Sequence, residues 1–124
     1  MGFWLGQALV GLVAALHLGF LVLEMFVWNT PAGRKLFGAT PEFADQAAAI
    51  MANQGLYNGF LAAGLAWSLL LGTAPHAFGL KVFFLGCVIV AGVYGAVTVK
   101  PTIALIQALP AALALLAVLA GQRG

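Results

Sequence analysis

Four long runs of apolar residues limit what this sequence can fold into more than any other feature. In a helix, about 20 apolar residues are enough to cross the hydrocarbon core of a bilayer. The four runs reach that length and cover about residues 3–28, 42–71, 75–99 and 101–120. We therefore predict an all-α integral membrane protein in which each run forms one span.

The composition agrees with a location in the lipid bilayer. Charged residues make up 6% of the chain and hydrophobic residues 64%, whereas soluble domains carry roughly 25% charged residues. The five basic residues are scattered along the chain, so we expect no nucleic-acid partner. The single cysteine, Cys87, cannot form an internal disulfide and lacks the neighbours of a zinc site. We interpret Cys87 as a packing residue.

Short connections between the runs predict how the helices are arranged. The second and third runs are separated only around residues 72–74, and the third and fourth only around Lys100. Connections this short join antiparallel neighbours, as in an up-down helical bundle. We therefore predict a single four-span domain over residues 1–124, folded as an up-down four-helix bundle.

The one long connection, residues 29–40, contains signals that begin and end helices. Thr30 followed by Pro31 is typical of an N-cap and the first position of a helix. Gly38 is typical of the residue that ends a helix, and Thr40 before Pro41 repeats the start signal. These signals predict a short interfacial helix between the first and second spans.

Glu24 is the most unusual residue in the first run because it places a carboxyl group inside a predicted membrane span. Ionisable residues within spans are costly to bury and usually mark a functional site. An alternative interpretation is a static ion pair near the membrane surface, with Arg34, Lys35 or Lys100 as the partner. In that case Glu24 would have only a structural role.

Polar residues from the other runs are predicted to lie at a depth similar to that of Glu24. With a rise of about 1.5 Å per residue, Glu24 lies about 6 Å inward from Trp28. We expect Glu24 to face the bundle interior, close to Asn53 or Gln54 and toward Tyr94 or Gln107. The candidate ligand-binding residues of this intramembrane cluster are Glu24, Asn53, Gln54, Tyr57, Asn58, Tyr94, Gln107 and His17.

The same amides and tyrosines have an alternative role, because such side chains often form hydrogen bonds that hold membrane helices together. Gly55 and Gly59 form a pair of small residues that permits close approach of two helices. Pro110 is expected to bend the fourth span and to free a carbonyl group inside the membrane.

Several segments, in their order along the chain, resemble the domain of unknown function 1304 family of small bacterial integral membrane proteins. The most specific is Asn53–Gly64, in which no departure from the family pattern is seen. The other residues and segments are His17, Leu23–Phe26, Trp28, Thr30–Pro31, Gly33–Lys35, Phe37–Gly38, Glu42–Ala44, Val90–Gly95 and Gln107. The resemblance implies a four-helix membrane protein in the bacterial inner membrane. It implies no catalytic residues, because the family has no assigned activity.

Three functions are compatible with these observations, and we favour the first. It is the binding or transport of a small polar molecule or ion, with Glu24 as the titrating or cation-pairing group. Because four short helices are few for alternating access, transport would call for a homo-oligomer.

The second function is a membrane enzyme in which Glu24 or His17 acts as acid or base on a lipid-soluble substrate. The third is an accessory or scaffold subunit of a membrane complex. We expect no metal site and no cofactor, because His17 alone is not a set of ligands.

Overall fold

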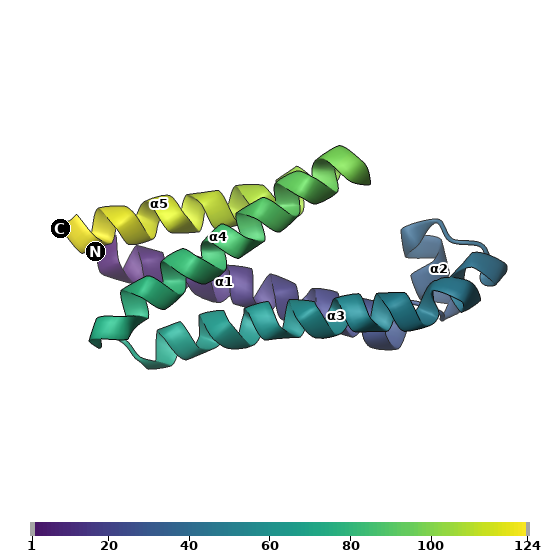
Figure 1. Ribbon diagram of the computed structural model, residues 1–124, viewed down its shortest axis with the longest axis horizontal. Coiled ribbons are helices and arrows are strands. Elements are labelled where there is room, and N and C mark those ends of the chain that lie inside the picture. Colours follow the sequence, from purple (N-terminus) through teal and green to yellow (C-terminus); the bar gives the residue numbers. More distant parts are fainter. Residues whose placement is uncertain (1, 124) are drawn as a thin grey trace. The chain divides into compact units, whose positions relative to one another are not determined.

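The computed structural model describes residues 2–123, and every regular element in this part of the chain is a helix (Figure 1). The all-α prediction is therefore confirmed. Two of the elements, η1 and η2, are π-helical turns, which are wider than α-helical turns. In chain order the elements are α1 (Gly2–Val22), η1 (Leu23–Val27), α2 (Pro31–Phe37), α3 (Pro41–Leu70), α4 (Pro75–Thr98), η2 (Ala104–Ala108) and α5 (Leu109–Arg123).

Within the described residues, three helical segments are long and apolar enough to cross a membrane. They are Gly2–Val27, Pro75–Thr98 and Ala104–Gln122, and they match the first, third and fourth predicted spans. This length and composition suggest a membrane protein. Helix α3 has 30 residues but is not among them. The amides of Asn53, Gln54 and Asn58 lower its hydropathy, so the second span and the four-helix bundle stay predictions.

The chain divides into two compact units, and α1 and α3 contribute to both. The first unit contains Met1–Ala15 and Ala63–Gly124, and the second contains Leu16–Ala62. The prediction of a single domain over residues 1–124 stays a prediction. Each unit is described separately below.

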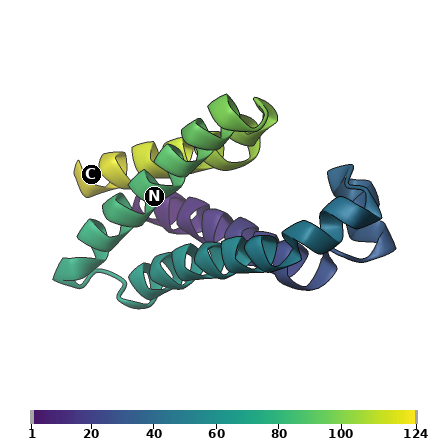
Figure 2. The same cartoon turned by 45° about the vertical axis from the view of Figure 1, so that its right-hand side comes forward.

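In the first unit, α4 and α5 run side by side in opposite directions in both views (Figures 1 and 2). Gly92 lets α4 approach η2, the turn before α5, since a Cβ atom there would lie 2.6 Å from the backbone nitrogen of Ala108. The fully buried side chains of Leu65, Leu85 and Val88 form part of the core of this unit. The short connection around Lys100 therefore joins antiparallel neighbours, as the sequence predicts.

The π-helical turn η2 has a clear cause in the sequence. Pro110 has no N–H group to donate to the carbonyl of Ile106, and its ring crowds that carbonyl in an α-helix. The chain widens before Pro110, so that the backbone N–H of Leu109 donates to the carbonyl of Ala104. Pro110 thus disturbs the fourth predicted span one turn before the proline itself.

In the second unit, the predicted interfacial helix forms with the predicted ends. The backbone N–H of Gly33 donates to the Thr30 side chain at 3.1 Å, which caps the start of α2. Gly38 ends α2 in the left-handed region with φ of 66°, a conformation that glycine adopts without strain. The backbone N–H of Phe43 donates to the Thr40 side chain at 3.2 Å and caps α3.

The two helices that flank this connection are tied together at its base. The indole Nε1 of Trp28 donates to the carbonyl of Ala44 at 3.0 Å, and Trp28 is buried. Next to it, the Asn29 amide donates to the Asp45 carboxylate at 2.6 Å. These two contacts bring the end of η1 against the first turns of α3.

Candidate functional site

Glu24 lies in η1 and meets α3 through one strong hydrogen bond. The amide Nδ2 of Asn58 donates to Oε1 of Glu24 at 2.6 Å. Asn58 is buried, with 7% of its surface exposed, and Glu24 is half-buried. Both residues belong to the second unit. The structure therefore joins two of the predicted site residues that are far apart in the sequence.

Glycines on α3 allow this contact to form. A Cβ atom at Gly55 would lie 3.1 Å from the Cβ of Glu24 and 2.8 Å from the Cγ of Met25. A Cβ atom at Gly59 would lie 2.5 Å from Cδ1 of Leu21. The predicted close approach at Gly55 and Gly59 is therefore confirmed. Because the backbones are close, the short Asn58 side chain can reach the carboxylate.

Glu24 sits in a π-helical turn, a feature that recurs at functional sites in helical proteins. The widened turn continues α1 up to Val27. There the carbonyl of Val27 accepts hydrogen bonds from the backbone N–H and the hydroxyl group of Thr30, at 3.0 and 2.7 Å. The nearest following proline, Pro31, already belongs to α2, and no residue in Leu23–Val27 signals this turn.

Within the second unit, neither Arg34 nor Lys35 forms an ion pair with Glu24, and a pairing with Lys100, which belongs to the first unit, stays a prediction. Arg34 instead donates to the backbone carbonyl of Asn29 at 2.9 Å and to its side-chain oxygen at 3.2 Å. Lys35 is exposed. The alternative interpretation of Glu24 as a partner of Arg34 or Lys35 is therefore not what this structure shows. A carboxylate has about four acceptor positions, and the Asn58 amide fills one of them.

The predicted neighbours Asn53 and Gln54 are exposed, and the amide that binds Glu24 is Asn58. The hydrogen bond thus comes from a residue one helical turn beyond Gln54, and the predicted closeness of Asn53 or Gln54 to Glu24 stays a prediction. A depth calculated for an ideal helix does not include the widened turn at Glu24. It also does not predict which face of α3 packs against η1. That face is set by Gly55 and Gly59, and Asn58 lies on it.

The remaining candidate residues differ in how far they are buried. Tyr57 is 58% exposed, and its ring packs edge-on against Phe60. His17 is fully buried, with its ring centroid 5.0 Å from that of Phe20. Tyr94 and Gln107 belong to the first unit, so their predicted approach to Glu24 stays a prediction.

Comparison with known families gives one match, which covers most of the chain. A family model described as protein of unknown function (DUF1304) matches residues 11–119. The matched range includes Glu24, Asn58 and the whole connection over residues 29–40. No curated protein and no solved structure matches the chain.

Proposed function

We propose, from the premise that this chain belongs to the DUF1304 family of proteins of unknown function, that it binds a small polar molecule or ion at Glu24. The protein would cross the bacterial inner membrane four times as an up-down helical bundle. The ligand would be a cation, because the group that receives it is a carboxylate. The hydrogen bond between Asn58 and Glu24 is the observation that carries this proposal.

The energetic argument concerns the charge of the carboxylate. A buried charge is costly unless it is paired or fully hydrogen-bonded. Asn58 provides one hydrogen bond, and neither Arg34 nor Lys35 of the same unit pairs with Glu24. A bound cation would complete the surroundings of the charged group. Asn58 would then hold the carboxylate in one orientation while the second oxygen receives the ligand.

Because the proposed site lies in a membrane protein, we extend the proposal from binding of the cation to its transport across the membrane. A cation that enters at Glu24 would pass between helices, and four short helices leave little room for alternating access. We therefore include a homo-oligomer in the proposal. Size-exclusion chromatography with light scattering in a mild detergent gives the number of copies, and a monomer in several detergents would count against this part.

A flux experiment on reconstituted vesicles tests the role of Glu24. Wild-type protein should raise the flux of at least one of three probes, sodium, potassium or protons, above that of empty vesicles. Glu24→Gln keeps the shape of the side chain, removes its charge and should reduce that flux about tenfold or more. Glu42→Gln is the matched control, because Glu42 is exposed at the start of α3.

Binding without transport is measured separately, by calorimetry of the same proteins with sodium and potassium chloride. Heat that is saturable in the wild type and in Glu42→Gln, but absent in Glu24→Gln, would support binding at Glu24. If Glu24→Gln equals the wild type with every probe in both assays, the proposal is wrong.

A further inference from the structure

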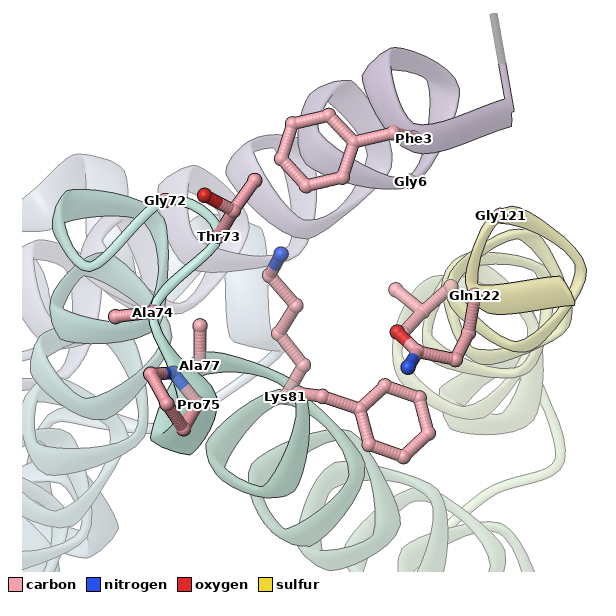
Figure 3. Close-up of a pocket in the computed structure, with 12 residues that line it drawn as sticks. Phe3, Gly6, Gly72, Thr73, Ala74, Pro75, Ala77, Lys81, Gly121 and Gln122 are labelled. Carbon is pink, nitrogen blue, oxygen red and sulfur yellow. The ribbon is translucent and has the colours of Figure 1, made fainter. Parts of the chain in front are cut away.

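A cavity of about 190 Å³ lies in the first unit, near the ends of its helices (Figure 3). Its walls come from the first turns of α1 and α4, the turn that joins α3 to α4, and the last turns of α5. This volume is large enough for several water molecules. It is therefore also large enough for one small oxyanion.

Lys81 of α4 extends into this cavity. Only 4% of its surface is exposed, so it is one of the most deeply buried polar residues described. Its Nζ atom lies 5.1 Å from the centre of the Phe3 ring, and Figure 3 shows it pointing toward Phe3 and the Thr73 side. Among the side chains of residues 2–122, which the structure describes, none forms a hydrogen bond or an ion pair with this ammonium group. Its three N–H donors are therefore left for a ligand.

Lys81 has no acidic side chain in its own unit. The three acidic residues are Glu24, Glu42 and Asp45, and all three fall within the second unit. Contact with the Phe3 ring gives partial compensation, because a ring face attracts a cation. It does not replace hydrogen-bond acceptors. The group that best completes this site is therefore an anion with several acceptor oxygens.

Other donors line the same cavity. The hydroxyl group of Thr73 and the amide of Gln122 belong to opposite walls, and Figure 3 shows both side chains beside the space around Lys81. Helix α4 begins at the cavity, and its N-cap residue Ala74 has no side chain that accepts from the first-turn N–H groups. The positive end of a helix favours a nearby anion.

We propose that this cavity binds a phosphate group, with Lys81 as its ionic partner and Thr73 and Gln122 as further donors. A lysine acts as a point charge toward phosphate and does not need the planar geometry that arginine requires. Helix ends lie at the membrane surface, where basic pockets between helices bind phospholipid head groups. The phosphate belongs either to a lipid head group or to a free anion. This site is separate from Glu24 and does not depend on the function proposed there.

Calorimetry in an uncharged detergent tests the site with three probes. They are inorganic phosphate, a short-chain phosphatidic acid, and the matching diacylglycerol, which lacks the phosphate. Wild-type protein should bind at least one phosphate-bearing probe saturably and should not bind diacylglycerol. Lys81→Met should weaken that binding by about tenfold or more, and Lys81→Arg should retain most of it. Lys100→Met is the control, because Lys100 is exposed in the same unit and should leave binding unchanged.

The probes also identify the source of the phosphate. Saturable binding of inorganic phosphate indicates a free anion, whereas binding of phosphatidic acid alone indicates a lipid head group. If neither phosphate-bearing probe binds, or if diacylglycerol binds equally well, the proposal fails. Equal binding by Lys81→Met and the wild type would also overturn it.

A second measurement uses the wild-type chain and does not depend on how the variants fold. In protein with ¹⁵N-labelled lysines, the phosphate-bearing probe should shift the Nζ signal of Lys81 and leave that of Lys100 in place. Equal shifts, or none at Lys81, would contradict the proposal.

Discussion

Glu24 receives one hydrogen bond, from an amide that is itself buried. The dependence is mutual, because the buried amide needs the carboxylate as an acceptor and the carboxylate needs the amide as a donor. A buried polar group that loses its partner costs more than the hydrogen bond itself contributed. The pair should therefore behave as a unit in stability as well as in ligand binding.

Replacing Asn58 tests this unit. Asn58→Ala should lower the free energy of unfolding by about 1–3 kcal/mol, because the Glu24 carboxylate loses its donor. Asn53→Ala is the matched control and should change it by less than about 0.5 kcal/mol, since Asn53 is exposed on the same helix. The measurement is unfolding in mixed micelles. Glu24→Gln combined with Asn58→Ala should cost less than the sum of the two single changes, and full additivity would argue against a coupled pair.

In the second unit, contacts near the helix ends hold the short helix α2 against η1. Gly33, in the first turn of α2, packs against the carbonyl of Val27, and a Cβ atom there would overlap that carbonyl. The same carbonyl already accepts from the Thr30 backbone and side chain. The short helix α2 is thereby fixed to the end of η1, and it has no room for a larger residue at this point.

Gly33→Ala should therefore loosen the connection over residues 29–40. The expected result is faster cleavage within this connection by a protease added to the folded protein, because the backbone must move to admit the methyl group. Gly79→Ala is the control, because a Cβ atom at Gly79 meets nothing within 4 Å. That change should be neutral or stabilising, since alanine favours a helix over glycine by about 1 kcal/mol. Equal cleavage rates in the two variants would contradict this account of α2.

At the scale of the whole molecule, the number of membrane crossings depends on α3. Three segments of the described chain are apolar enough to span a membrane, and α3 is long enough but more polar. If α3 also crosses, residues 29–40 and the turn after α3 must lie on opposite sides of the membrane. If it does not, they lie on the same side.

Cysteine labelling decides between these two topologies. In a Cys87→Ser background, which removes the only native cysteine, Lys35→Cys and His76→Cys place single thiols at exposed positions on either side of α3. Four spans predict that a membrane-impermeant maleimide labels one of them from outside intact cells and the other only after the cells are opened. Labelling of both from the same side would reject the four-span bundle.

The features that sequence analysis predicted correctly are those determined by neighbouring residues. Thr30 and Thr40 cap the helices that follow them, and Gly38 ends α2, because each signal acts within one helical turn. Asn58 as the partner of Glu24 was among the candidates, but the specific pairing was not predicted. It depends on a widened turn and on which face of α3 approaches, and both are properties of packing between distant segments.

The cavity around Lys81 shows the same limit. Its walls come from α1, α4, α5 and the turn after α3, so no local pattern could reveal it. Near Pro110, in contrast, the missing N–H group predicts disturbed hydrogen bonding, and the structure shows the π-helical turn η2 there.

The hydrogen bond from Trp28 to Ala44 has a consequence for the tryptophan fluorescence of the protein. Trp28 is 6% exposed, whereas Trp4 and Trp67 are 70% and 55% exposed. One of the three tryptophans is therefore buried, and the other two lie at the surface of the protein. A quencher attached to lipid tails would extinguish the emission of Trp4 and Trp67 and leave that of Trp28. The remaining fluorescence would report on the base of the connection over residues 29–40 without any added label.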